Sequence, residues 1–248
     1  MSDDEKATKT EQARRVREMF ATIAARYDLL NHLLSGNIDR AWRRRVAKTL
    51  FGILPAAAPS GSGQSRILDV ACGTGDLSFT LFESGEARIV GIDFCRPMLQ
   101  IASSKASRLG VEVPFIEGDA LALPFRDASF EAATIAFGLR NLVDVEAGFI
   151  ELLRVLKPGG RALVLEFSKP TTPVLRSLFK FYFTRVLPLL GGLISGSSSA
   201  YQYLPESVSR FPDQKELASI MKQAGFADVT FQNLSGGIAA LHLGMRPD

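Results

Sequence analysis

The feature that most constrains the fold of this chain is a short apolar run that passes through a glycine turn into a helix-like segment. Ile67–Ala71 reads as a strand, Cys72-Gly73-Thr74-Gly75 as the turn, and Asp76–Glu83 as a helix. Glycines in such a turn allow backbone angles that other residues avoid, and they let a ligand approach the main chain closely. This order of strand, turn and helix predicts a βαβ unit with a ligand site at the turn.

The same alternation of apolar runs and amphipathic stretches continues along the chain. Five strands are predicted, at Ile67–Ala71, Arg88–Asp93, Val113–Glu117, Ala132–Phe137 and Ala162–Phe167. Helices are predicted between them at Asp76–Glu83, Pro97–Leu109 and Val145–Leu156, and the Lys157-Pro158-Gly159-Gly160 break separates the last helix from the fifth strand. Repeated βαβ units favour a doubly wound, mostly parallel sheet of the Rossmann-like α/β class.

Additional segments flank these units on both sides. A helical stretch, Glu11–Leu54, leads into a Pro/Ala/Ser/Gly linker, so we expect residues 1–63 to form a helical cap and linker and residues 64–248 to form the ligand-binding domain. An apolar helical insert at 171–205 is expected to cover the substrate site. A final helix, Asp213–Ala224, and two strands around Val229–Asn233 and Ala239–Arg246 bring the predicted sheet to seven strands.

Composition excludes several classes of protein. A net charge of +3 over 248 residues is too small to indicate nucleic-acid binding by itself. The two cysteines, Cys72 and Cys95, form no disulfide framework and are expected to be free thiols in a reducing compartment. Met1–Glu11 is polar and has no apolar signal segment, and the uncharged stretch Val186–Pro205 is too rich in glycine and serine to span a bilayer well. We therefore expect a cytoplasmic protein.

Acidic residues at the strand ends indicate the kind of cofactor. A dinucleotide fingerprint would need a third glycine where the chain has Ser78, and Asp76 at the helix start would repel a pyrophosphate. A cationic nucleoside without phosphate suits this turn better. Asp93 could accept both hydroxyls of a ribose, Asp119 could accept from an adenine amino group, and the Ala120 amide could donate to the ring. The alternative is that these aspartates merely cap helices.

Several longer motifs carry a resemblance to a known family. They are Phe20–His32, Ile67–Leu77, Gly118–Ala120 with Leu123–Phe125, Phe137–Asn141, Leu156–Gly160, Leu165–Pro170, Tyr203–Ser207, Arg210–Gln214 and Asn233–Ile238. The chain, from about residue 16 to residue 246, resembles the ubiquinone/menaquinone biosynthesis C-methyltransferases. The glycine turn is generic to class I methyltransferases, whereas Phe137–Asn141, Leu165–Pro170 and the Tyr-Asp-Leu-Leu-Asn-His opening are specific to this family.

The resemblance implies a class I methyltransferase that uses S-adenosyl-L-methionine. The implied reaction is C-methylation of a prenylated quinol, demethylmenaquinol to menaquinol, with the benzoquinol step of ubiquinone synthesis as a second reaction. The cofactor-binding residues predicted from the turn and the resemblance together are Asp69, Gly73, Thr74, Gly75, Asp93, Asp119, Ala120 and Ala136. Family members often have serine at the last position, so a contact from a side-chain hydroxyl is lost at Ala136.

Three residues are candidates for catalysis. Removing the proton of the quinol hydroxyl would make the ring carbon nucleophilic, so the site needs a base and a group that stabilises the phenolate. Arg140 is predicted to stabilise the phenolate and Asn141 to orient the ring oxygen; the alternative is a structural arginine paired with Asp144 or Glu166. His32 is the predicted base because histidine titrates near neutrality, and the alternative is a hydrogen-bonded helix histidine.

The remaining candidates concern the substrate and its surroundings. Tyr27, Tyr201 and Tyr203 are predicted to line the quinol pocket unless they only fill the core, and His242 reads as a core or surface residue. The insert is interpreted as a cover that admits a polyprenyl tail and makes peripheral contact with the inner face of the membrane, or else as a lid helix buried on the sheet. The sequence leaves the oligomeric state open, with a homodimer as one candidate, and no metal is expected.

Rival functions are methylation of another small molecule or of RNA. Methylation of amino groups on bases would want an Asn/Asp/Ser-Pro-Pro-aromatic turn where this chain has Phe137-Gly138-Leu139-Arg140. Cytosine C5 methylation would want a nucleophilic cysteine, and both cysteines lie at the cofactor end. Binding of nucleic acid is therefore not expected.

Overall fold

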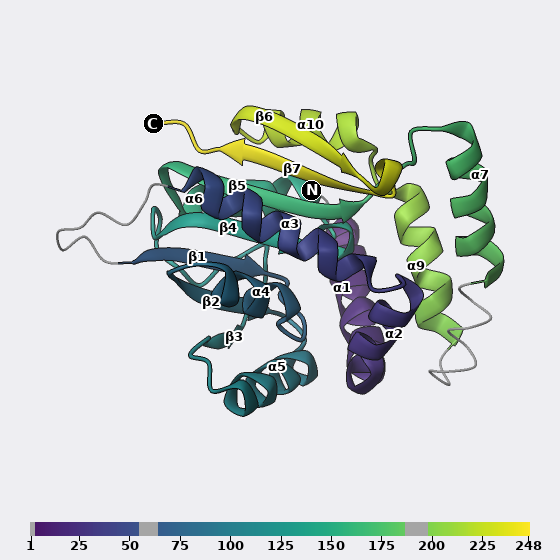
Figure 1. The fold of residues 1–248 in the computed structure, drawn as a ribbon, viewed down its shortest axis with the longest axis horizontal. Coiled ribbons are helices and arrows are strands. Elements are labelled where there is room, and N and C mark those ends of the chain that lie inside the picture. The colour runs from purple at the N-terminus through teal and green to yellow at the C-terminus, as the bar shows by residue number, and fades with distance from the viewer. Residues whose placement is uncertain (1–2, 55–63, 187–197) are drawn as a thin grey trace.

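A seven-stranded sheet forms the centre of the molecule in a computed structural model, which describes residues 3–54, 64–186 and 198–248 (Figure 1). Its strands are β1 Ser65–Val70, β2 Ala87–Asp93, β3 Phe115–Glu117, β4 Phe130–Ala136, β5 Leu156–Phe167, β6 Ala227–Leu234 and β7 Ala239–Met245. Their order is β3-β2-β1-β4-β5-β7-β6, and β7 alone runs antiparallel to both of its neighbours. The prediction of a mostly parallel, doubly wound seven-stranded sheet is confirmed.

Helices cover both faces of this sheet. The described helices are α1 Asp3–Ile23, α2 Tyr27–Leu34, α3 Ile38–Ile53, α4 Asp76–Ser84, α5 Arg96–Leu109, α6 Val145–Val155, α7 Pro173–Phe181, α9 Ser198–Arg210 and α10 Gln214–Gln223. One apolar cluster joins α3 and α4 to the sheet, and a second joins α6 and α10 to it from the other face. Parallel strands need this double cover because both of their faces are apolar.

Of the three N-terminal helices, α3 packs on the sheet. In α3 the buried residues recur every three or four positions, among them Trp42, Val46 and Leu50, so one face of this helix packs on the sheet. Figure 1 shows α3 lying across the sheet, while α1, α2, α7 and α9 gather beyond the end of β5. The predicted linker falls at residues 55–63, outside the described residues, and the division at residue 63 stays a prediction.

The largest difference from the predicted elements is at β5. This strand begins at Leu156, ahead of the predicted start at Ala162, and Leu156 pairs with Phe130 before the register shifts and Arg161 pairs with Ala132. Gly159 has a φ of +72°, a conformation that is easy only for glycine, so the glycines form a bulge inside the strand and do not end it. Among the described helices, none has the length and apolar character needed to cross a bilayer.

Candidate active site

The glycine turn after β1 has the backbone that its sequence predicts. Gly73 and Gly75 have φ angles of +56° and +88°. A Cβ on Gly75 would lie 2.8 Å from the ring of Phe79 and 2.9 Å from that of Phe115, so only glycine fits there. The Gly73 amide donates to Oδ2 of Asp93 over 2.8 Å, which joins the turn to the end of β2.

A cavity of about 100 Å³ opens beside this turn, at the ends of the parallel strands. Of the predicted cofactor residues it is lined by Gly73, Asp93, Asp119, Ala120 and Ala136. Asn141 from the segment after β4 also lines it, and so do Ala13 and Phe20 of α1. The crossover topology therefore brings strand ends that are distant in sequence to one cavity, as expected for an open α/β sheet.

The other three predicted cofactor residues are not among the described lining residues of this cavity. Asp69 is buried within the sheet and accepts hydrogen bonds from Ser78 over 2.6 Å and from Thr134 over 3.0 Å. Thr74 donates to Asp28 of α2, and Gly75 packs on aromatic rings. These contacts place the three residues as supports of the turn.

The charges of the cavity favour a cationic nucleoside. Asp93 is 7% exposed and accepts from the amides of Gly73 and Cys95, each over 2.8 Å. Burial raises the pKa of its carboxyl group to about 6. Asp93 and Asp119 face the cavity, and its described lining includes no lysine, arginine or histidine to bind a phosphate. The residues present therefore fit a sulfonium nucleoside such as S-adenosylmethionine and fit a dinucleotide poorly.

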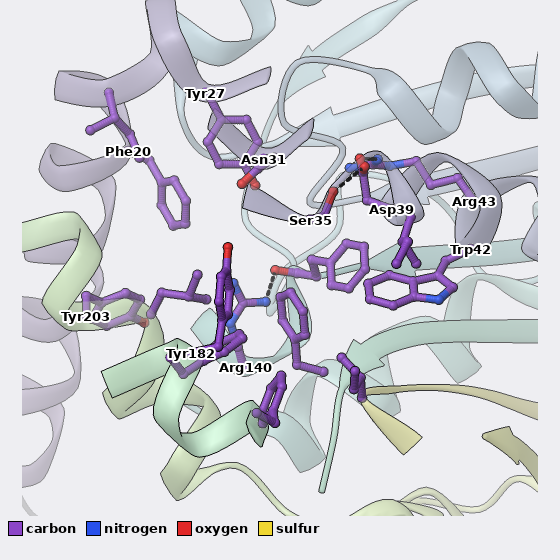
Figure 2. A pocket seen from close by; sticks show the side chains of 18 of the residues that line it. Phe20, Tyr27, Asn31, Ser35, Asp39, Trp42, Arg43, Arg140, Tyr182 and Tyr203 are labelled. Atoms are coloured by element: carbon purple, nitrogen blue, oxygen red, sulfur yellow. Dashed lines mark hydrogen bonds and ion pairs between the residues drawn. The ribbon is translucent and has the colours of Figure 1, made fainter. Parts of the chain in front are cut away.

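A second, larger cavity of about 220 Å³ adjoins the first and is mainly apolar (Figure 2). Its lining comes from α1, α2, α3, the ends of β4 and β5, α7 with the turn after it, and α9, and it includes Ile23, Trp42, Phe167, Phe179, Phe183 and Leu204. Phe20, Tyr27 and Phe137 line both cavities. These three aromatic residues therefore stand where the two cavities meet.

Arg140 lines the larger cavity, and its guanidinium forms a buried ion pair with Glu166. Its Nη1 donates to Oε1 of Glu166 over 2.7 Å, and its side chain is 6% exposed. The backbone amide of Arg140 donates to the other carboxylate oxygen of Glu166, and Phe167 lies 5.4 Å below the guanidinium. The predicted alternative of a Glu166 pair is thus present, whereas Asp144 caps α6 and pairs with Lys9. Nε of Arg140 has no partner among the described residues.

Asn141 and Tyr203 meet between the cavities. The Tyr203 hydroxyl donates to Oδ1 of Asn141 over 3.0 Å, and Nδ2 of Asn141 donates to the carbonyl of Phe137. Phe137 has a φ of +58°, a strained angle for a residue with a large side chain, and such strain is typical of functional sites. Burial raises the pKa of Tyr27, although the charge of Arg140 acts to lower it. The side chain of Tyr201 lies outside what the structure describes.

His32 does not line the larger cavity, although its neighbour in space does. His32 Nδ1 lies 2.8 Å from Oδ2 of Asp39, and Asp39 lines the cavity. The sequence did not single out Asp39, because it lies in the first turn of α3 whereas His32 belongs to α2, and only the turn between these helices brings the two side chains together. His242 is a core residue, 1% exposed, with Nε2 2.8 Å from the carbonyl of Gln214.

Comparison with known proteins identifies the family. The sequence model described as the ubiE/COQ5 methyltransferase family matches residues 7–246. The chain belongs to this family. A demethylmenaquinone methyltransferase of Thermus thermophilus is 51% identical over 230 residues, which are 92% of this chain and 100% of that protein. A ubiquinone/menaquinone biosynthesis C-methyltransferase of a Geobacter species is 45% identical, over 96% of this chain and 98% of that protein.

Solved structures of more distantly related proteins share the fold of this methyltransferase. An S-adenosylmethionine-dependent methyltransferase of Thermotoga maritima superposes with a TM-score of 0.61 at 18% identity, covering 93% of this chain and 99% of that one. The [4+2]-cyclase SpnF superposes with a TM-score of 0.67 at 18% identity, over 95% and 96% of the two chains. The fold is therefore shared with a protein named for a different reaction, so the substrate must be argued from the cavity.

Proposed function

We propose that this methyltransferase transfers a methyl group from S-adenosylmethionine to a ring carbon of a prenylated quinol. The observation that carries the proposal is the pair of adjoining cavities, one acidic at the strand ends and one apolar, which share Phe20, Tyr27 and Phe137. The names of the relatives agree with a naphthoquinol, demethylmenaquinol, and with the benzoquinol of ubiquinone synthesis as a second substrate.

The cofactor would lie in the smaller cavity. Asp93 would accept the ribose hydroxyls, Asp119 the adenine amino group, and the Ala120 amide would donate to the adenine ring. When bound, S-adenosylmethionine supplies an electrophilic methyl group. Asp69, Thr74 and Gly75 would stabilise the conformation of the turn, because they contact α2, α4 and β4 and not the cavity.

The quinol ring would lie in the larger cavity, between Tyr27 and Tyr203. Arg140 would stabilise the phenolate oxygen, because a guanidinium stays protonated and donates hydrogen bonds. Asn141 would orient the ring oxygen, since its own amide is held by Tyr203 and Phe137. Positioning of the ring carbon against the methyl donor is worth up to ~7–11 kcal/mol in well-oriented reactions.

The prenyl tail would leave the cavity past α7, at a membrane surface. Phe179 of α7 lines the cavity, whereas Val174, Leu178 and Phe181 are 71%, 60% and 61% exposed. These three residues are spaced by four and three positions, so they form one outward stripe, the α7 outer face. Lysine and arginine are the charged residues between Glu166 and Glu206, which suits an anionic bilayer. We therefore propose peripheral contact with the inner face of the membrane.

A methylation assay tests the proposed function. Purified protein with S-adenosylmethionine is expected to convert demethylmenaquinol with a short prenyl tail into a product heavier by one CH2 unit, measured by mass spectrometry. Unmethylated RNA and the unprenylated naphthoquinol serve as competing substrates. Transfer to RNA with none to any quinol would contradict the proposal.

A further inference from the structure

The larger cavity has one carboxylate among its described lining residues, and it belongs to Asp39. Asp39 is 4% exposed and lies in the first turn of α3. A buried acid in a mainly apolar cavity carries a cost of desolvation. Figure 2 shows Asp39 with Ser35 and Arg43 at one side of the cavity, apart from Arg140.

The carboxylate of Asp39 is bonded in a way that leaves room for a ligand. Oδ2 meets His32 Nδ1 at 2.8 Å and also pairs with Arg43, while Oδ1 accepts one hydrogen bond, from Ser35 over 2.6 Å. A carboxylate oxygen can accept two hydrogen bonds, so Oδ1 keeps one position for a donor in the cavity. A quinol hydroxyl is such a donor.

A chain of titratable groups leads from Asp39 to the surface. On the far side of His32, Nε2 lies 3.5 Å from Oδ2 of Asp76 in α4. The exposed fractions of the three side chains rise along this path, from 5% at Asp39 to 18% at His32 and 22% at Asp76. Imidazole has two ring nitrogens, so it can take a proton on one side and release it on the other.

The surrounding charges argue for proton transfer over metal binding. Ligand atoms of His32, Asp39 and Asp76 lie within 4.8 Å of one another, a spacing that could hold a cation. Arg43 already pairs with Asp39, and Lys105 pairs with Asp76 and with Asp28. These two cations already pair with the carboxylates, so a metal ion would have to displace them to bind.

C-methylation needs such a path because it produces a proton. The methyl group replaces a hydrogen on the ring, and the positive charge of the sulfonium is lost when the methyl group leaves it. Each turnover therefore releases one net proton into a buried cavity. Burial raises the pKa of Asp39, but hydrogen bonds from Ser35 and Arg43 and the nearby charges outweigh it and hold the pKa below its usual value. Asp39 is therefore ionised at neutral pH and can accept a proton.

We propose that Asp39 accepts the hydroxyl proton of the substrate and that His32 and Asp76 carry it to solvent. The O–H bond electrons stay on the substrate oxygen, the methyl group takes the place of the hydrogen on the ring carbon, and the proton from that C–H bond restores the hydroxyl. The proton taken up by the Asp39 carboxyl group passes to Nδ1 of His32, which contacts Oδ2, and Nε2 of His32 releases a proton to Asp76 and water. This inference rests on the proposed function. It assigns Asp39 as a catalytic residue and His32 as a residue that acts through it.

Two isosteric variants test the path kinetically. Asp39→Asn keeps the shape but cannot accept a proton, and kcat is expected to fall about 10²-fold or more with the KM for quinol little changed. Its residual kcat should rise about tenfold per pH unit, because only substrate already ionised in water can react. His32→Asn keeps a donor to Asp39 and should lower kcat by about tenfold. Glu131→Gln, which removes a carboxylate paired with Lys157 far from the cavity, should leave kcat unchanged.

A measurement without turnover separates this inference from the proposed function. The chain has two histidines, His32 and His242, so their ring nitrogens can be resolved by ¹⁵N NMR. With S-adenosylhomocysteine present, added 1-naphthol is expected to move the His32 signals and leave those of His242, and Asp39→Asn should abolish that movement while calorimetry shows naphthol still bound. Unmoved His32 signals in the wild type, or a loss of kcat in Asp39→Asn that is equal at every pH, would overturn the inference. Absence of quinol methylation with the NMR response intact would instead overturn the proposed function.

Discussion

At the scale of single residues, the site pairs each buried charge with a second buried group. The cavity-lining guanidinium of Arg140 is held by Glu166, which also accepts from the amides of Arg140 and Phe167. Burial raises the pKa of Glu166, and this effect outweighs the nearby charge of Arg140, which acts to lower the pKa. An ion pair of this kind adds little net stability, but removing one partner leaves the other buried and unpaired. It fixes where the guanidinium points.

Arg140→Ala is expected to lower turnover by about 10²–10³-fold while cofactor binding is kept, because the phenolate loses its donor. The same change should destabilise the protein by about 3 kcal/mol, since the carboxylate of Glu166 stays buried without a partner. Urea unfolding, quinol turnover and calorimetry check the three parts. Adding Glu166→Gln to Arg140→Ala should restore most of the stability and none of the turnover; restored turnover would end the proposed role of Arg140.

At the scale of elements, α7 has two apolar sides. Phe179 faces the cavity and packs on Phe183, with ring centroids 4.1 Å apart, whereas the α7 outer face is exposed. In the sequence, apolar residues cover most of the surface of this helix. That pattern is compatible with a membrane contact and equally with a lid helix buried on the sheet. The described fold leaves one side of α7 uncovered. An uncovered apolar side agrees with a membrane contact.

The double variant Val174→Glu and Leu178→Glu is expected to bind anionic vesicles at least tenfold more weakly. Each substitution removes about 1.5–3 kcal/mol of apolar contact and adds a negative charge that the vesicle repels. Co-sedimentation measures the binding. Methylation of a water-soluble quinol should be unchanged, since neither residue lines the cavity. Leu109→Glu, at the exposed end of α5, is the matched control, and equal loss of binding in that variant would contradict a specific α7 contact.

At the scale of the whole molecule, the sheet holds two buried acids, Asp69 and Asp93, at the ends of neighbouring strands. Burial raises the pKa of each carboxyl group to about 6, against 3.8 in an exposed chain. The folded protein therefore binds more protons than the unfolded chain between these values, so its stability falls as the pH rises through that range and levels off above about pH 6.

Asp69→Asn is expected to stabilise the cofactor-free protein by about 1–3 kcal/mol at pH 8 and to have little effect at pH 4. The hydroxyls of Ser78 and Thr134 can rotate to suit the amide, so the local packing is kept. Urea unfolding at the two pH values measures the difference. An equal change in stability at both would show that the charge of Asp69 is not its cause.

Much of the fold was accessible from the sequence because periodicity reports burial. Alternating apolar runs and amphipathic stretches predicted the parallel sheet, and the glycine turn marked the ligand site. The early start of β5 was not predictable from local signals, because proline and glycine between two elements usually mark a loop, and only pairing with β4 turned them into a bulge.

The sequence by itself determined the family, the strand ends that form the smaller cavity, and the candidate residues Arg140, Asn141 and His32. Only the tertiary structure decided which side chain each of them contacts, because those partners come from elements far apart along the chain. Glu166 reaches Arg140 from the next strand, and Tyr203 reaches Asn141 from α9. Asp39 lines the larger cavity and contacts His32 only because α2 and α3 come together in the fold.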